Sequence, residues 1–211
     1  MLTTLLIRHA TCDHLGRSIA GRAPGVHLNA VGRDEARTLA GWLSRIQMKA
    51  SAPVRALQAV YSGPLERATE TAEILARELG LPIQIEPGLN ELDFGAWTGL
   101  SLTELDADPV WHAFNSAREH TRIPGGELMS QAIDRATAAL SRIELAHPEG
   151  MIAVVSHGDI IRGLVLRALR MSLNEVHRIE VAPASVSAVE MSNGEPCRAL
   201  SVNWRPGGPI G

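Results

Sequence analysis

The chain has 211 residues, of which 45% are hydrophobic, and a formal net charge of −3 at pH 7. This length and composition predict one domain with a sizeable buried core. The lack of a basic excess argues against a nucleic-acid partner, because such a partner needs positive charge to neutralise its phosphates.

The N-terminal segment and the two cysteines bear on location. Residues 1–7 form an apolar run too short for a signal-peptide core, and no segment has the length of a membrane span. Cys12 and Cys197 do not suggest a disulfide framework in a chain of this length, and neither has the neighbouring cysteine of a typical zinc site. We therefore expect a soluble cytoplasmic protein with free thiols and no bound metal.

The first predicted strand covers residues 5–7, a short apolar run that stops at Arg8 and His9. A run of this kind indicates a buried strand, and its end delivers these two polar residues to the edge of a sheet. Residues 11–28 hold four glycines or prolines and show little periodicity. We expect a long loop here, and long loops in compact domains are often functional.

A helix is predicted next, with Asn29 as its N-cap. The helix is indicated by apolar residues at helical spacing, namely Ala36, Leu39, Ala40, Leu43 and Ile46. Residues 48–56 then form a polar connection to a strand at residues 57–61.

A second helix is predicted between Pro64, at a first-turn position, and Gly80, which ends it. Residues 83–85 form a third short strand. Residues 88–128 differ from the rest because they are rich in aromatic residues and glycine, and we interpret them as an insertion that caps one end of the sheet. Ser101 and Glu104 have the spacing of a capping box and predict a short helix there.

The strongest predicted strand is residues 151–155, which ends at Ser156-His157-Gly158. A helix precedes it, with Ile133, Ala136, Leu140 and Ile143 on one face, and another follows it over residues 160–169. Late strands are predicted at about residues 178–182, 186–191 and 198–203.

The alternation of strands and helices predicts an α/β fold, a three-layer α/β/α sandwich with a mostly parallel sheet. We expect a single domain over residues 1–204, with the cap insertion at about 88–128. Residues 205–211 are rich in glycine and proline and are predicted to form a flexible tail.

Two of the predicted strands end in similar residues, Arg8-His9 and His157. Sites in open α/β sheets lie beyond the carboxyl ends of the strands, so these side chains converge if the two strands are neighbours. Arg67 lies near the first turn of the second helix and can point to the same edge. Guanidinium groups present planar paired donors that suit a phosphate better than lysine does.

Glu91 is the candidate general acid. It lies in an aromatic, glycine-rich segment, Leu89 to Gly99, where a carboxyl group can be partly desolvated. Burial raises the pKa of a carboxyl group and allows it to hold a proton near neutral pH. Asp93 lies two residues away and competes for this role.

Four motifs in this order resemble the histidine phosphatase (phosphoglycerate-mutase-like) superfamily over about residues 3–195, and specifically its phosphatases. They are Arg8-His9-Ala10, the segment Ser62 to Ala72, the segment Glu91 to Gly99, and Ser156-His157-Gly158. Arg-His alone is a weak signal, whereas four motifs at the family's spacing are strong together.

The resemblance implies a metal-independent phosphatase that acts on a small phosphorylated metabolite through a phosphohistidine. His9 would be the nucleophile and Glu91 the proton donor. The phosphate would be bound by Arg8, Arg67 and His157, with further substrate contacts from Ser62 and Thr11. No cofactor, metal or membrane is implied, and a homodimer is one of the oligomeric states left open.

Some features leave the function open. The family's usual glycine after the nucleophile is Ala10 here, and the loop over residues 11–27 lacks the family's more common pattern. A phosphoglycerate mutase would share every catalytic residue, although mutases of this family tend to be longer. A phospholigand-binding module without activity is the second alternative. The loops at 11–28 and 92–127 shape the pocket, so the substrate is not fixed by the motifs.

Overall fold

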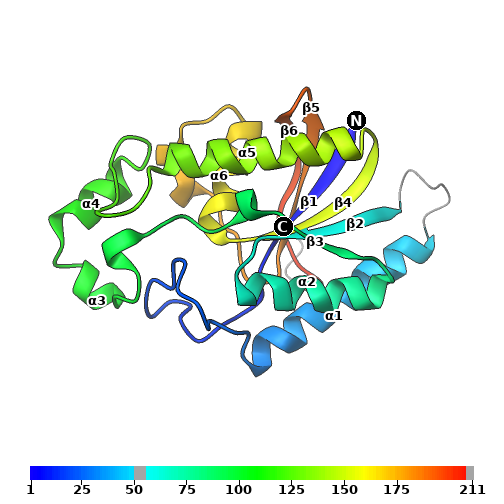
Figure 1. Ribbon diagram of the computed structural model, residues 1–211, viewed down its shortest axis with the longest axis horizontal. Coiled ribbons are helices and arrows are strands. Elements are labelled where there is room, and N and C mark those ends of the chain that lie inside the picture. The colour runs from blue at the N-terminus through cyan, green and yellow to red at the C-terminus, as the bar shows by residue number, and fades with distance from the viewer. Residues whose placement is uncertain (50–55, 208–211) are drawn as a thin grey trace.

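The computed structural model describes residues 1–49 and 56–207, which form one six-stranded sheet with helices on both faces (Figure 1). The strand order is β3-β2-β4-β1-β5-β6. The strands are β1 (Leu2–Arg8), β2 (Leu57–Ser62), β3 (Ile83–Ile85), β4 (Gly150–Ser156), β5 (Val186–Ser192) and β6 (Glu195–Trp204). β1 to β4 run parallel, whereas β5 is antiparallel to both β1 and β6. The predicted α/β sandwich is confirmed, with an antiparallel pair at one edge.

The neighbouring position of β1 and β4 decides where the motif residues meet. The two strands pair in parallel without a register shift, from Leu2 opposite Gly150 to Arg8 opposite Ser156. Their apolar runs are continuous because both faces of the sheet are covered. The strands therefore end at the same level, and the chain beyond each end delivers His9 and His157 to one edge.

Two pairs of helices cover the sheet. α1 (Ala30–Lys49) and α2 (Glu66–Leu79) lie on one face, and α5 (Met129–Ala146) and α6 (Gly158–Ala168) lie on the other, above the sheet in Figure 1. Asn29 caps α1 as predicted, because its Oδ1 accepts from Gly32 N at 2.9 Å. α2 begins at Glu66, two residues after Pro64, and ends at Gly80, whose φ of 66° is the left-handed conformation that glycine adopts most readily.

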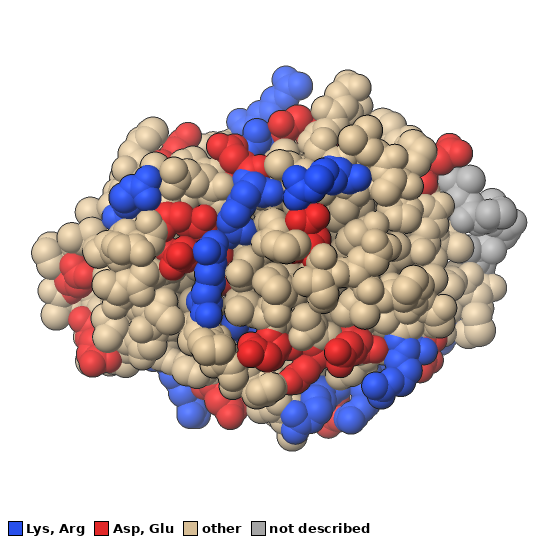
Figure 2. Space-filling model, in the orientation of Figure 1, with Lys and Arg blue, Asp and Glu red and all other residues tan. Residues whose placement is uncertain are grey.

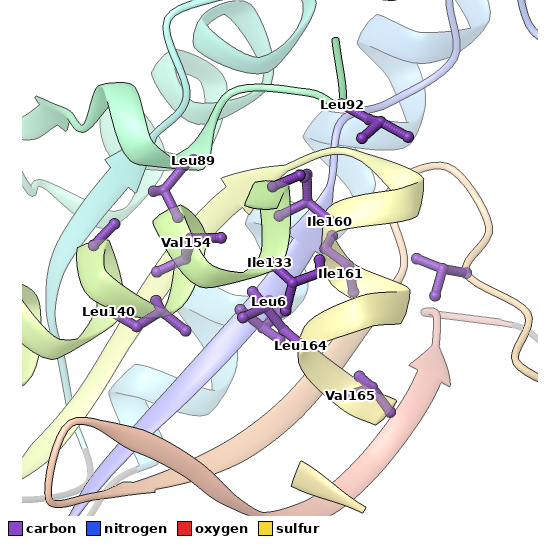
Figure 3. Close-up of a cluster of buried hydrophobic side chains, with 14 of the residues drawn as sticks. Leu6, Leu89, Leu92, Ile133, Leu140, Val154, Ile160, Ile161, Leu164 and Val165 are labelled. Carbon is purple, nitrogen blue, oxygen red and sulfur yellow. The ribbon is translucent and has the colours of Figure 1, made fainter. Parts of the chain in front are cut away.

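Apolar packing on both faces of the sheet stabilises these layers. Figure 3 shows the cluster between the sheet and α5 and α6, where Leu6 and Val154 of β1 and β4 meet Ile133, Leu140 and Leu164 of the helices. These five side chains are between 0% and 2% exposed. Complete burial of one such side chain contributes about 1.5–3 kcal/mol. The packing therefore holds the strand ends, and the polar residues beyond them, in fixed positions.

The predicted insertion lies beyond the carboxyl ends of the parallel strands, at the left of Figure 1, beside the loop over residues 11–28. It contains the 3₁₀ turns η2 (Pro87–Leu89) and η3 (Gly95–Trp97) and the helices α3 (Leu102–Leu105) and α4 (Pro109–Ser116). The capping box of Ser101 and Glu104 is present at α3. α4 was not predicted, although Asp108 and Pro109 give the sequence signal of a helix start, and Asp108 Oδ1 accepts from Val110 N at 2.8 Å.

The predicted strand at residues 178–182 is wrong. Leu173–Arg178 form a 3₁₀ helix (η4), and an irregular loop follows up to β5. The carbonyl groups of this loop bind arginine side chains instead of a neighbouring strand: Ile179 O accepts from Arg162 Nε at 3.0 Å, and Val181 O accepts from Arg8 Nη1 at 2.6 Å. A backbone group that is satisfied by a side chain does not need a strand partner.

Two predictions fall partly outside the described residues. Residues 50–55 of the predicted polar connection are not among them, and residues 48–49 belong to α1. Of the predicted flexible tail, residues 206–207 form a turn, and residues 208–211 are not described. Within the described part of the chain, no helix combines the length and the apolar character needed to cross a membrane.

Candidate active site

The motif residues gather in a pocket of roughly 180 Å³ at the carboxyl ends of the parallel strands. Arg8, His9, Arg67 and Glu91 all line it, whereas His157 is fully buried and not among the lining residues, although its ring packs beside that of His9. The loop over residues 11–28 and the cap insertion also contribute to its wall, as expected. The wall residues from these segments are Cys12, His14, Leu15, Gly16, Ser18, Ile19, Ala20, Gly21, Phe94 and Leu102.

His9 lies directly after β1 and is held in one tautomer. Its Nδ1 lies 2.8 Å from the carbonyl oxygen of Ala10, which can only accept, so Nδ1 carries the proton. Its Nε2 accepts from Arg67 Nε at 3.3 Å and therefore has the lone pair. Burial, followed by the positive charges of Arg67 and Arg8, lowers the pKa of His9 to about 3. The imidazole is therefore neutral near pH 7, as a nucleophile must be.

Arg8 and Arg67 place two guanidinium groups beside this imidazole. Arg67 is 2% exposed, and its Nη2 donates to Gly21 O at 2.7 Å. Arg8 is anchored by Nη1 to Val181 O. Burial lowers the pKa of both arginines, but the ordinary value is so high that both stay charged at neutral pH.

Several buried nitrogen atoms at this site have no hydrogen-bond partner among the described residues. They are Arg8 Nε, Arg67 Nη1, and both ring nitrogens of His157. The rings of His9 and His157 lie 5.2 Å apart between centroids. Burial and the charge of Arg67 hold the pKa of His157 well below its usual value, so its ring is neutral and has one donor nitrogen. Buried polar groups are nearly always paired, so unpaired donors at one site indicate that an anion binds there.

Glu91 has the protonation behaviour expected of a general acid. Burial, followed by the negative charge of Asp159, raises the pKa of Glu91 from 4.5 to about 7. Its Oε2 lies 3.9 Å from His157 Nδ1, and its Oε1 accepts from Leu92 N at 2.9 Å. The competing Asp93 is not at the pocket wall and pairs with Arg22 at 3.3 Å. Glu91 is thus the carboxyl group that the structure brings to the site.

Arg135 of α5 holds the loop that carries Glu91. Its Nη1 donates to Gly88 O at 2.8 Å and to Asn90 O at 2.7 Å, and its Nη2 donates to Glu91 O at 2.7 Å. Arg135 also pairs with Glu127 at 2.8 Å. A single guanidinium therefore binds three backbone carbonyl groups between residues 88 and 91, which keeps the Glu91 carboxyl group in position.

Ser62 and Thr11, predicted to contact substrate, are not brought to the pocket. Ser62 is fully buried at the end of β2, and its hydroxyl donates to Gly63 O at 2.8 Å. Thr11 lies against the start of α1, where its N–H donates to Glu35 Oε2 at 2.9 Å. The carbonyl of Thr11 would lie 2.1 Å from a Cβ atom at Gly32, so this close approach requires glycine in α1.

Ala10 is compatible with the site. Its φ angle is not positive, so the conformation does not require glycine. Its side chain is fully buried in the apolar cluster under α1 and α2, and its N–H donates to Thr71 Oγ1 at 3.1 Å. The expected difficulty with alanine at this position is therefore absent.

Three charged residues that the motifs did not reveal lie beside the pocket. Asp159 and Arg162 of α6 line it, and Arg118 of the cap pairs with Asp159 at 3.1 Å. Asp159 directly follows the Ser-His-Gly motif and Arg162 lies three residues further on, and this proximity was the only sequence signal for them. His14 and Cys12 also line the pocket, and His14 Nδ1 lies 2.7 Å from Ser18 Oγ. Among the residues that the structure describes, no group of His, Cys, Asp and Glu side chains forms a metal site.

Comparison with known proteins identifies the family. Residues 4–205 match the histidine phosphatase superfamily (branch 1). The chain is 35% identical over 196 residues to phosphoglycerate mutase-like protein 4 of Arabidopsis thaliana. This alignment covers 90% of the chain and 80% of the relative. It is 34% identical over 189 residues to the metal-independent phosphoserine phosphatase of the same plant, over 82% of the chain and 75% of the relative. Against several similar mycobacterial proteins, the chain spans 49% of the relative's length.

Solved structures agree with this fold. The mycobacterial glucosyl-3-phosphoglycerate phosphatase superposes with a TM-score of 0.81 at 21% sequence identity, over 95% of the chain and 98% of that structure. At this identity the likeness establishes the fold alone. The match over residues 4–205, together with relatives above 30% identity, means that the chain belongs to branch 1 of the histidine phosphatase superfamily.

Proposed function

We propose that this chain hydrolyses phosphomonoesters of small metabolites, with His9 as the nucleophile that accepts the phosphoryl group. One observation carries the proposal. Among the described residues, Arg8, Arg67 and His157 have buried nitrogens without a hydrogen-bond partner beside an imidazole whose Nε2 lone pair is free of a proton. Each hydrogen bond that these donors form to a phosphate oxygen would contribute about 1.5–3 kcal/mol, because one partner is charged. The metal-independent phosphoserine phosphatase, 34% identical to this chain, supports hydrolysis as the reaction class.

The first chemical step transfers the phosphoryl group. The lone pair on His9 Nε2 forms a bond to phosphorus while the bond from phosphorus to the ester oxygen breaks. Arg8, Arg67 and His157 bind the three equatorial oxygens on which negative charge collects. Protonated Glu91 donates its proton to the departing oxygen. The alcohol leaves, and the protein holds a phosphohistidine and an ionised Glu91.

The second step uses the same groups in reverse. Ionised Glu91 takes a proton from a water molecule, the water oxygen bonds to phosphorus, and the bond from phosphorus to Nε2 breaks. Inorganic phosphate leaves, and both His9 and Glu91 return to their starting states. A pKa of about 7 allows Glu91 to serve as acid and then as base near neutral pH. The arginines supply the positive charge that metal ions provide in other phosphotransfer enzymes, so no metal is required.

A mutase that moves the phosphoryl group within phosphoglycerate is the second candidate, and the name of the first plant relative favours it. The site residues are common to both reactions. A requirement for a bisphosphoglycerate primer would separate the mutase from the hydrolase, since only the mutase begins from a phosphorylated enzyme.

Partner, location and oligomeric state complete the proposal. On the face in Figure 2, acidic and basic side chains are intermingled, and we propose a small metabolite rather than a nucleic acid as the partner. Cys12 and Cys197 are free thiols, which suits the cytoplasm. A homodimer is also proposed, and size-exclusion chromatography with light scattering tests it.

The test is a phosphatase assay with p-nitrophenyl phosphate, with and without EDTA, followed by acid and alkaline treatment of enzyme quenched during turnover. We expect activity that survives the chelator and a phosphoryl group that is labile in acid but stable in alkali. His9→Ala should lose both, whereas His120→Ala, at an exposed position in the cap, should keep both. Turnover by the His9→Ala variant, or an enzyme that never carries acid-labile phosphate, would refute the mechanism.

A further inference from the structure

Two arginines from distant parts of the chain bind the same backbone oxygen, that of Glu91. Arg22, in the loop over residues 11–28, donates from Nε to Glu91 O at 2.8 Å, and Arg135 of α5 donates from Nη2 to the same oxygen at 2.7 Å. A carbonyl oxygen has two lone pairs, and both have a donor here. Two guanidinium groups therefore fix the position of one peptide group, the one that joins Glu91 to the next residue.

This peptide group also orients the carboxyl group of Glu91. The Glu91 carbonyl and the Leu92 N–H belong to one planar unit, so contacts that fix the carbonyl also fix the direction of the N–H. Leu92 N donates to Glu91 Oε1 at 2.9 Å, and Glu91 Oε2 lies 3.9 Å from His157 Nδ1. One carboxyl oxygen is therefore held by the backbone, and the other points to a residue of the phosphate site.

Two carboxylates hold the arginines in place. Glu127 Oε1 accepts from Arg22 Nη2 at 2.7 Å and from Arg135 Nη2 at 2.8 Å. Asp93 Oδ2 accepts from Arg22 Nη1 at 3.3 Å, so all three nitrogens of Arg22 have an acceptor. The Glu127 side chain is only 17% exposed, so solvent screens these ion pairs less than it screens pairs on an open surface. Two positive and two negative side chains cancel, and the group adds no net charge beside the pocket.

The loop that carries Arg22 is itself bound to the cap insertion by backbone hydrogen bonds. Ile19 N donates to Leu100 O at 2.9 Å, and Ile19 O accepts from Gly99 N at 2.7 Å. These bonds lie three residues before Arg22 in the chain. Arg22 therefore reaches Glu91 from a loop whose own position is fixed.

We infer that Arg22 is a positioning residue for proton transfer: with Arg135 and Glu127 it fixes the Glu91 peptide group, and this directs the carboxyl group to the departing oxygen of the substrate. The inference rests on the proposed phosphatase function. In the part of the chain that the structure describes, the wall of the pocket includes none of these three supporting residues. They act on the reaction through Glu91 and not by contact with the substrate.

The alternative is that the four charged residues only stabilise the cap. Removal of Arg22 would then lower the turnover of every ester alike, through a distorted pocket or a smaller folded fraction. A positioning role instead predicts a loss that depends on the leaving group, because a poor leaving group needs the proton of Glu91 far more than a good one.

The experiment compares phenyl phosphate with p-nitrophenyl phosphate, two esters of similar shape, of which phenyl phosphate has the poorer leaving group. The parameter is kcat/KM, which covers the reaction up to the transfer of the phosphoryl group to His9. Arg22→Gln should lower kcat/KM for phenyl phosphate about 10- to 100-fold, because misplacement of a reacting group by about 1 Å costs on the order of 10²-fold. The loss for p-nitrophenyl phosphate should stay below about threefold. Arg22→Lys keeps a charged donor for Glu91 O and should recover part of the loss.

A double-mutant cycle with Glu91→Gln tests whether the effect passes through the general acid. Glutamine has no acidic proton to donate, so Arg22→Gln should lower kcat/KM for phenyl phosphate by no more than about twofold in that background. Losses that multiply in the double variant would mean that Arg22 acts independently of Glu91, and would overturn the inference.

Arg17→Gln is the matched control, because Arg17 is an exposed arginine of the same loop and does not line the pocket. It should leave kcat/KM for both esters unchanged. Glu127→Gln covers the case in which Arg22→Gln does not fold. Its amide oxygen can still accept from Asp93 N, as Glu127 Oε1 does at 2.9 Å, but it lacks the charge that holds both arginines. Its loss should be at least about threefold larger for phenyl phosphate than for p-nitrophenyl phosphate.

Equal losses for the two esters, in whichever of these variants folds, would overturn the inference while leaving phosphatase activity in place. A wild-type enzyme that hydrolyses neither ester would instead refute the proposed function.

Discussion

Replacement of Glu91 by glutamine should make the protein more stable and less active at once. Burial and the charge of Asp159 raise the pKa of Glu91 from 4.5 to about 7. The native state therefore holds this proton more tightly than the unfolded state, so the ionised carboxylate destabilises the fold above pH 7. Each unit of pKa shift corresponds to about 1.4 kcal/mol, so the ionised carboxylate lowers the free energy of unfolding by about 3 kcal/mol.

The sign of this effect depends on pH. Below about pH 4.5 the carboxyl group is protonated in both the folded and unfolded states, and the penalty vanishes. It grows as pH rises through the window between 4.5 and about 7 and is complete above it. Glutamine carries no charge at any pH and can still accept from Leu92 N. Glu91→Gln should thus exceed the wild type in free energy of unfolding by about 3 kcal/mol at pH 8, with only a small difference at pH 4.5.

Activity should respond in the opposite direction. The loss of the proton donor should lower kcat/KM for alkyl phosphates about 10²- to 10⁴-fold. An aryl phosphate with a good leaving group needs little protonation, so p-nitrophenyl phosphate should lose much less in this parameter. In the wild type, kcat/KM for alkyl esters should fall as pH rises above about 7, where Glu91 loses its proton.

The assays are urea denaturation at pH 4.5 and 8 and steady-state kinetics on both kinds of ester. Equal stability of the variant and the wild type at pH 8 would refute the electrostatic description of Glu91. Equal kinetic losses for alkyl and aryl esters would refute its role as a general acid, because a misplaced pocket would affect both alike.

The remaining predictions concern the phosphate site and the backbone of its cap. Arg67→Lys should lower kcat/KM about 10²-fold, because lysine cannot contact His9, Gly21 O and phosphate together. Arg77→Lys, at an exposed position of α2, is the control and should leave kcat/KM unchanged. A loss below about threefold for Arg67→Lys would contradict its role in phosphate binding. Gly95→Ala should destabilise the protein by about 2 kcal/mol or more in urea denaturation, because φ is +46° and a Cβ atom would lie 2.3 Å from Pro124 O. Gly41→Ala, in α1 with no atom within 4 Å, should instead stabilise it by up to about 1 kcal/mol, and equal effects of the two changes would contradict the argument.

The sequence by itself determined the local elements and the chemistry of the site. Apolar runs predicted β1, β2 and β4, and Asn29 and Gly80 marked helix ends, because strand burial and helix capping depend on residues close together in the chain. The order of the four motifs predicted the family. The same signals could not decide which way a side chain points: Ser62 and Thr11 belong to motif segments, but they turn away from the pocket.

Only the tertiary structure decided how the site functions as a unit. The parallel register of β1 and β4 brings His9 to His157, and residues 179–182 hold Arg8 and Arg162 by carbonyl groups where the sequence had predicted a strand. The pKa of Glu91 depends on burial and on Asp159, which is distant in sequence. Such properties depend on distances between segments far apart in the chain, and these distances exist only after the sheet and its helices have packed.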